Sequence, residues 1–146
     1  MSPNPAPSTA LASLLPQPLP APPADRLFLY VFRRLAAHGL HDAAAAQAML
    51  GAFSAGFQRP LIAVRALVAD LCAAAAGPIQ VAPCCCCRMT GSEAALMAVI
   101  GRAERQPETA ALLLADLVSR RHADGVLATA TLVAAAFADA GHPIGT

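Results

Sequence analysis

The chain of 146 residues contains no lysine and no tryptophan, and only 13% of its residues are charged. All 10 basic residues are therefore arginines, and the formal net charge is +1. A charge so close to zero argues against a protein that binds nucleic acid by neutralising many phosphates. It argues equally against a polybasic membrane-binding surface. We therefore expect neither nucleic acid nor a membrane among the partners.

Long apolar runs are also missing. No stretch of about eighteen apolar residues is free of charge, so the sequence predicts no membrane-spanning helix. The first residues lack the basic side chain of a secretory signal, and prolines interrupt their leucines. We therefore expect a cytoplasmic protein, in a reducing compartment where cysteine thiols stay free.

Several catalytic motifs are absent as well. The sequence contains no G-x-S-x-G element, no phosphate-binding P-loop, no glycine-rich nucleotide turn and no H-E-x-x-H metal motif. No class of enzyme is indicated by these signals, and we expect a protein without catalytic activity.

Proline is concentrated at the start of the chain. Of the 13 prolines, 8 lie between Pro3 and Pro23, and no charged residue precedes Asp25. Because proline fixes φ and removes a backbone donor, residues 1–24 are predicted to form a disordered or polyproline-II tail. The segment Pro16–Pro20 fits a ligand for an aromatic groove, or simply a solvated linker.

Beyond the tail, the pattern is helical throughout. Hydrophobic residues make up 57% of the chain, and they recur at the spacing of one helix face. The sequence predicts an all-α domain over residues 25–146, a compact bundle of about six helices. Capping residues or prolines mark the six expected starts, at Asp25, Asp42, Pro60, Thr90, Pro107 and Asp124.

The apolar faces of these helices can be assigned from the spacing alone. In the first helix, the inward face is formed by Phe28, Val31, Phe32 and Leu35. Arg33 and Arg34 fall away from this face and are interpreted as solvated charges. In the second helix, the inward residues are expected to be Leu50, Phe53 and Phe57.

Four consecutive cysteines, Cys84–Cys87, are the most unusual feature of the sequence, and Cys72 is the fifth. The run lies in residues 78–89, which form the single non-helical break expected inside the domain. If the five cysteines were placed at random, roughly 2 × 10⁻⁴ such runs would be expected per chain of this composition. We interpret the break as a loop, because no partner strand is evident.

Thiolates are soft ligands, so the run can be tested against metal chemistry. Cys84 and Cys87 have the C-x-x-C spacing that supplies two ligands from one turn. A tetrahedral zinc site needs further ligands, from a second subunit or from Cys85, Cys86, Cys72 and His122. Copper(I) accepts fewer ligands, so two thiolates suffice, with Met89 as a further soft donor. An iron–sulfur cluster fits less well, because its cysteines are normally spread along the chain.

Redox chemistry and simple packing are the alternatives. Arg88 and the helix that starts at Thr90 would favour a thiolate, and a C-x-x-C pair can form a disulfide. Free cysteines also pack as small apolar residues. Some cysteines of the run are expected to be buried and others exposed.

The histidines admit two interpretations each. His122 with Asp124 could form an oriented base for a cysteine nucleophile, although helix capping by Asp124 explains the same residues more simply. His38 and His41 could share a metal ion, or they could be exposed side chains at a helix end.

The segment from Ile79 to Thr90, with Pro83–Cys87 at its centre, resembles the signature of a small uncharacterised helical family of bacteria. The later segment His122–Gly125 is similar to it too. The resemblance covers roughly residues 25–143 and implies a bacterial, cytoplasmic protein with no assigned activity. The family's cysteine run is usually shorter, so Cys87 is the departure, which favours Cys84–Cys86 as the working thiols.

Two functions follow from these patterns, and a third, an enzyme with a cysteine nucleophile and His122 as its base, has the least support. The first is a helical protein that binds zinc or copper(I), or senses redox state, through Cys84–Cys87 and His122. The second is a helical interaction module, with a protein partner or a second copy, in which the cysteines only pack.

Overall fold

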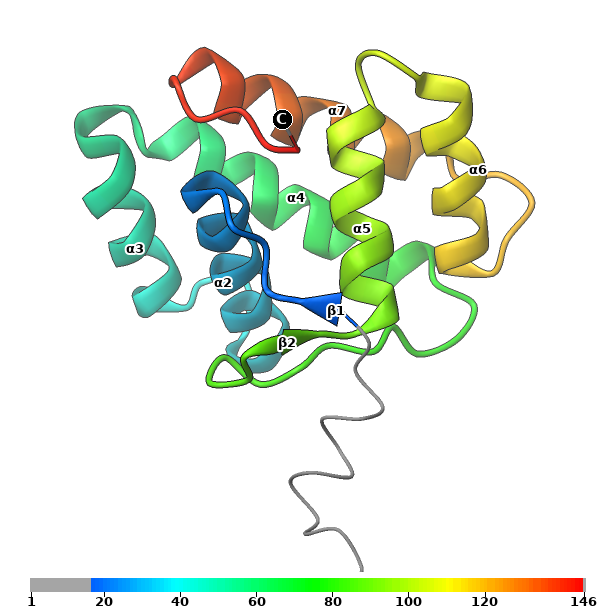
Figure 1. Ribbon diagram of the computed structural model, residues 1–146, viewed down its shortest axis with the longest axis horizontal. Coiled ribbons are helices and arrows are strands. Elements are labelled where there is room, and N and C mark those ends of the chain that lie inside the picture. Colours follow the sequence, from blue (N-terminus) through cyan, green and yellow to red (C-terminus); the bar gives the residue numbers. More distant parts are fainter. Residues whose placement is uncertain (1–16, 146) are drawn as a thin grey trace, which may run out of the picture.

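The computed structural model describes residues 17–145, and within that range it contains six α-helices, one short 3-10 helix and two strands of two residues each (Figure 1). In chain order these are β1 (Gln17–Pro18), α2 (Pro23–His38), α3 (Ala43–Phe53), η1 (Ser54–Gly56), α4 (Gln58–Ala74), β2 (Arg88–Met89), α5 (Gly91–Arg102), α6 (Pro107–Val118) and α7 (Asp124–Asp139). The predicted all-α fold of about six helices is confirmed. No helix among them is long and apolar enough to cross a bilayer.

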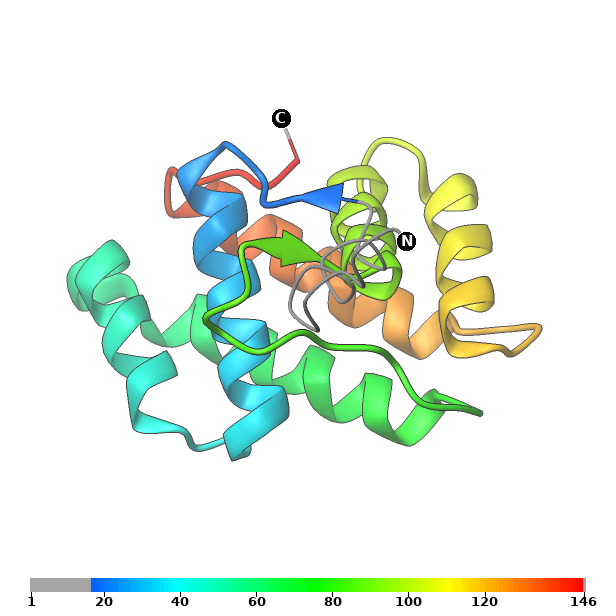
Figure 2. The ribbon, with the colours of Figure 1, turned by 60° about the horizontal axis from the view of Figure 1, so that its bottom comes forward.

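Helices α4 and α7 pack along each other through the middle of the molecule. Helices α2 and α3 form a pair on one side of them, and α5 and α6 form a pair on the other (Figure 1). Figure 2 shows the same division after rotation, with the chain between α4 and α5 crossing the front. This crossing segment carries the cysteine run.

Aromatic rings at the centre of the core join three of the helices. Phe28 stacks on Phe32 within α2, with ring centroids 6.0 Å apart. Phe137 of α7 meets Phe28 edge to face at 6.3 Å and Phe53 of α3 at 5.2 Å. The predicted inward face of the first helix is therefore buried as expected, together with Val31 and Leu35.

Two of the predicted helix starts are formed by local hydrogen bonds. The Asp42 carboxylate accepts from the Ala45 N–H at 2.9 Å and so caps α3. At α5, the Thr90 hydroxyl accepts from the Glu93 N–H at 3.0 Å, and the Glu93 carboxylate accepts from the Thr90 N–H at 2.9 Å. This reciprocal pair is the capping box that the spacing predicts.

Two other predicted caps are wrong. Helix α2 begins at Pro23, with Pro22 as its N-cap, because prolines have the φ that a first turn requires. Asp25 lies inside that turn, and its carboxylate accepts from the Gly145 N–H at 3.1 Å. Asp124 is the first residue of α7 rather than its cap and makes no capping hydrogen bond.

The inward face of α3 also differs from the prediction. Leu50 is 48% exposed, whereas its neighbour Met49 is fully buried. Phe53 and Phe57 are partly buried against the core, as expected. The inward face of α3 therefore consists of Ala45, Met49 and Phe53. It shares Phe53 with the predicted face but has Met49 in place of Leu50, and Phe57 lies beyond the end of the helix.

The folded domain starts earlier than the predicted boundary at residue 25. Strand β1 pairs antiparallel with β2, so that Gln17 faces Met89 and Pro18 faces Arg88. The loop therefore does have a partner strand, supplied from about seventy residues earlier in the chain, and an edge position tolerates the proline. Residues 17–24 belong to the domain, while the tail predicted for residues 1–16 lies outside the described residues.

Candidate functional site

The cysteine run lies on a loop that joins the segment after α4 to strand β2 (Figure 1). The Cys86 N–H donates to the Pro83 carbonyl at 3.0 Å. This bond closes a four-residue turn with Cys84 and Cys85 at its centre. The turn holds the run at the tip of the loop.

All five thiols are free and they differ in exposure, but none is fully buried, although some cysteines of the run were expected to be. Cys85 and Cys87 are exposed, whereas Cys84 and Cys86 are half-buried. The two thiols of the run that are exposed together are therefore Cys85 and Cys87. The C-x-x-C spacing had suggested Cys84 and Cys87 as the pair. The sequence could not give this grouping, because it depends on how the turn sits on the domain.

A buried arginine holds the loop from below. Arg33 is 3% exposed, and its guanidinium donates to both carboxylate oxygens of Glu93, at 2.6 and 3.0 Å. The remaining donors reach three loop carbonyls: those of Cys86 at 2.9 Å, Arg88 at 2.8 Å and Pro83 at 3.3 Å. One side chain thus fixes both ends of the turn and strand β2 to helices α2 and α5.

These hydrogen bonds compensate for the burial of two opposite charges, those of Arg33 and Glu93. Glu93 is 1% exposed, so both ions have lost their water, which is costly unless hydrogen bonds replace it. The two-pronged geometry and the three carbonyl acceptors supply those bonds. The interpretation of Arg33 as a solvated charge is therefore wrong. We call Arg33 and Glu93 together the Arg33–Glu93 clamp.

A second arginine lies beside the run. Arg34 donates to both carboxylate oxygens of Asp42, at 3.0 and 2.9 Å. These hydrogen bonds lower the pKa of Asp42 and raise that of Arg34, against the opposing effect of desolvation. Cys84 lies near the Arg34 guanidinium. The end of α2, the start of α3 and the cysteine loop therefore meet at one point.

The other predicted ligands lie elsewhere. His122 is exposed on the connection between α6 and α7. This connection and the cysteine loop lie on different sides of α5 (Figure 1, Figure 2). Cys72 is on α4. Within residues 17–145, no group of three or more His, Cys, Asp or Glu side chains is placed to hold a metal ion. The four-ligand zinc site considered from the sequence is not preformed.

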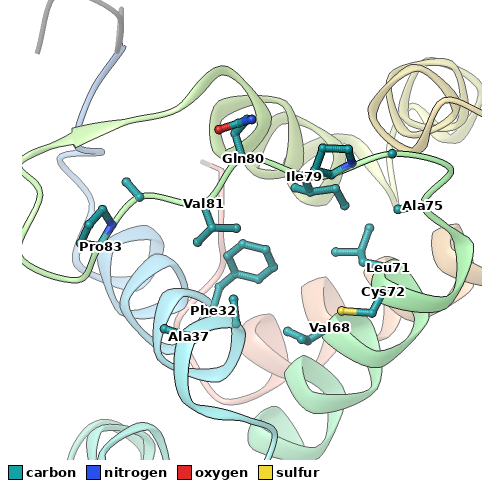
Figure 3. A pocket seen from close by; sticks show the side chains of 14 residues that line it. Phe32, Ala37, Val68, Leu71, Cys72, Ala75, Ile79, Gln80, Val81 and Pro83 are labelled. Atoms are coloured by element: carbon teal, nitrogen blue, oxygen red, sulfur yellow. The ribbon is translucent and has the colours of Figure 1, made fainter. Parts of the chain in front are cut away.

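An apolar groove that no pattern in the sequence predicted lies next to the loop. The groove has a volume of about 760 Å³ and lies between α2, α4 and residues 75–83 (Figure 3). Figure 3 shows Val81 and Ile79 above it, Phe32 on one wall and Cys72 on the other. No lining residue is charged; the set is Phe32, Ala36, Ala37, Val68, Leu71, Cys72, Ala75, Gly77, Pro78, Ile79, Gln80, Val81, Ala82 and Pro83.

The segment that roofs the groove is anchored to helix α5. The Thr90 hydroxyl donates to the Gln80 carbonyl at 2.7 Å. The Gln80 N–H donates to the Ser92 hydroxyl at 3.4 Å. Thr90 therefore caps the helix and holds the roof at the same time.

The chain is similar to one family of known sequences. Residues 7–116 match the model of a family of unknown function, DUF6628. The match includes the segment around the cysteine run, as the resemblance implied, but it begins well before residue 25 and ends before His122. No curated protein and no solved structure matches the chain.

Proposed function

Because the chain belongs to this family of unknown function, we propose its role from its own geometry: it is a non-enzymatic protein that binds a soft metal ion, copper(I), through the thiolates of Cys84–Cys87. The observation that carries the proposal is the exposure of free thiols on a loop whose backbone is held by the Arg33–Glu93 clamp. A loop fixed before binding spends little conformational entropy when its side chains take up a ligand.

The number of ligands favours copper(I) over zinc. Structural zinc needs four ligands in a tetrahedron, and the described residues hold no group of three. Copper(I) is soft and is satisfied by two thiolates. Cys85 and Cys87 are the exposed thiols of the run, so they are the first candidates for this pair.

The proposal also requires a compartment in which the thiols stay reduced. All five cysteines are free in the described structure. The cytoplasm maintains thiols in this state, and we place the protein there as part of the proposal.

Native mass spectrometry of protein purified without oxygen and without an affinity metal tests the proposal directly. One equivalent of copper(I) is added, followed by a copper(I) chelator as competitor. The full chain is expected to retain one copper ion. The variant with serine at all four positions, Cys84→Ser through Cys87→Ser, is expected to lose it.

The control is Cys72→Ser, which removes the one free thiol that lies outside the loop among the described residues. This variant should retain copper as the full chain does. Copper retained by the fourfold serine variant, or no copper bound by the full chain, would overturn the proposal. Circular dichroism of each variant establishes that the helices remain folded.

Native mass spectra of the full chain also distinguish redox sensing from copper binding. With hydrogen peroxide as oxidant, one thiolate would attack a peroxide oxygen and become a sulfenic acid, releasing hydroxide. A second thiolate would then displace the sulfenic oxygen, forming a disulfide and giving water after proton uptake. A mass lowered by both thiol hydrogens in the full chain, with no copper bound, would assign the loop to redox sensing.

The groove favours a second candidate, a helical module that binds a protein partner or another copy of itself. Its uncharged lining and volume are typical of a surface that buries apolar groups. Under this alternative, serine at Cys84–Cys87 would change stability without changing any bound partner.

A further inference from the structure

The apolar groove is long, and its roof is a single stretch of irregular chain. Every residue from Gly77 to Pro83 lines it, and none of these residues belongs to a helix or a strand. Figure 3 shows Pro83 and Ala37 at one end of the groove and Ala75 at the other. At about 3.3 Å per residue, the roof is up to roughly 20 Å long. A groove of this form fits a linear molecule better than a compact one.

The size and the lining of the groove are those of a site for an apolar small molecule. Small-molecule sites in proteins occupy about 300–1,000 Å³, and this groove has about 760 Å³. Phe32, Val68 and Leu71 contribute large apolar side chains to it. No lining residue is charged, so an ion enclosed here would be costly. The part of a ligand that lies inside the groove must therefore be uncharged and apolar.

A cation lies at the Ala75 end of the groove. The Arg120 Nε–H donates to the carbonyl of Ala74, the last residue of α4. The next residue, Ala75, lines the groove. The Ala76 N–H donates to the Val118 carbonyl at 2.9 Å and fixes the end of α6 at the same place. The Arg120 guanidinium is therefore held beside one end of an apolar groove.

The charge of Arg120 is not matched by an acidic side chain. Arg120 is exposed and forms no ion pair within residues 17–145. Residues 119–123, which surround it in the chain, contain two arginines and no acidic residue. The Ala74 carbonyl takes one N–H donor of the guanidinium, and the planar fork of this group matches a carboxylate. An apolar chain with an anion at one end is therefore complementary to the groove and to Arg120 together.

We propose that the groove binds an anionic amphiphile, a long-chain carboxylic acid, with its chain along the groove and its carboxylate on Arg120. The chain packs on Phe32 and Val68 and covers the Cys72 thiol. The ligand is a free small molecule, unlike the protein partner of the second candidate function. The site uses none of the thiols of Cys84–Cys87, so it does not depend on the copper(I) proposal.

Dodecanoate, kept below the concentration at which it forms micelles, is the probe. The protein is the full chain with serine at Cys84–Cys87, so that Cys72 is its one thiol. N-ethylmaleimide alkylates this thiol by addition across its double bond. Dodecanoate at about ten times its dissociation constant should slow the alkylation about tenfold, because only the empty groove exposes Cys72.

Titration calorimetry separates the contribution of the chain from that of the carboxylate. Decanoate is shorter by two methylenes and should bind about fifteenfold more weakly than dodecanoate, since each buried methylene contributes about fourfold. Dodecanol has the same chain without the charge. It should bind about tenfold more weakly than dodecanoate, because it lacks the charged hydrogen bonds to Arg120.

Two variants test the two ends of the contact. Arg120→Gln should weaken the binding of dodecanoate about tenfold and leave that of dodecanol unchanged. Its matched control is Arg105→Gln, which removes the same charge from an exposed arginine near the other end of α6. Ala36→Trp fills the groove from α2 and should abolish binding. Its control, Ala52→Trp, changes an exposed alanine of α3 that does not line the groove.

The proposal fails on any of three results. The first is an alkylation rate of Cys72 that dodecanoate does not change. The second is equal affinity for dodecanoate and dodecanol with no effect of Arg120→Gln, which would assign an uncharged ligand to the groove. The third is binding that Ala36→Trp leaves unchanged, which would place the ligand elsewhere. Circular dichroism reports whether each variant is folded, and the alkylation test needs neither variant.

Discussion

Arg33 and Glu93 are sixty residues apart in sequence, yet their side chains form a buried ion pair with 2.6 Å between Nε and Oε2. The pair joins α2 to the first turn of α5 and leaves three arginine donors for the cysteine loop. It connects the fold to the candidate site, because the elements that form the core also determine where the loop lies.

Removal of one member of this pair should be strongly destabilising. Arg33→Met leaves Glu93 buried without its cation, and we expect the free energy of unfolding to fall by about 3–5 kcal/mol. Denaturation in urea measures this change. The control is Arg59→Met, which breaks an ion pair with Asp139 whose side chains are 61% and 63% exposed. That change should cost less than about 1 kcal/mol, and an equal loss in both variants would contradict the importance of burial.

The Arg34–Asp42 pair should make stability depend on pH. Hydrogen bonds from Arg34 lower the pKa of Asp42 in the folded chain. A carboxyl group with a lowered pKa stabilises the fold above its unfolded value, near 3.8, and this contribution is lost as pH falls through the folded value. Asp42→Asn keeps a good helix cap but removes the charge.

The difference in unfolding free energy between the parent chain and Asp42→Asn should therefore be largest near neutral pH. It should shrink as the pH is lowered through the acid range. Urea denaturation at several pH values gives the difference directly. A difference independent of pH would show that the charge of Asp42 does not contribute.

Thr90 should affect both α5 and the roof of the groove. Thr90→Ala removes the helix cap and the bond to the Gln80 carbonyl, and we expect a loss of about 1–2 kcal/mol. Hydrogen exchange at Gln80 should become faster. Thr90→Ser retains the hydroxyl and should restore both properties. Thr131→Ala is the control, since its hydroxyl donates only to Leu127 within its own helix.

The end of the described chain packs closely on α5, through two glycines. A Cβ on Gly145 would lie 2.6 Å from the Gly101 Cα, and Gly145 has φ +75°. Gly145→Ala should therefore reduce the free energy of unfolding by about 1–3 kcal/mol and lower the melting temperature. Gly125→Ala, where a Cβ has open space, should leave it unchanged or raise it. Equal melting temperatures for the two variants would contradict this packing.

Local signals in the sequence predicted much of the helical fold. The spacing from Thr90 to Glu93 gave the capping box, and the periodicity around Phe28 gave a buried face. These features depend on residues within about two helical turns. The N-cap of α2, Pro22, lies three residues before the predicted cap, Asp25. Asp25 is a residue type that caps helices well, and the sequence does not indicate that its partner is Gly145.

The candidate site was less accessible to the same reasoning. The cysteine run was evident in the sequence, but the contacts that hold its loop in place were not. These contacts join residues far apart in the chain: Arg33 pairs with Glu93 across sixty residues, and β1 pairs with β2 across about seventy. One signal could have been used: Arg33 is four residues after buried Leu29, at the edge of the apolar face. The groove depends on how α2, α4 and residues 75–83 come together, which no local pattern contains.

The Arg33–Glu93 clamp binds the loop through carbonyl oxygens, which every amino acid possesses. It therefore recognises the path of the backbone and is indifferent to the side chains of the exposed positions, Cys85 and Cys87. Substitutions at these positions are therefore expected to change the chemistry of the loop and to leave its backbone contacts with Arg33 in place. The domain thus offers a site whose reactivity can diverge during evolution independently of the protein's ability to fold.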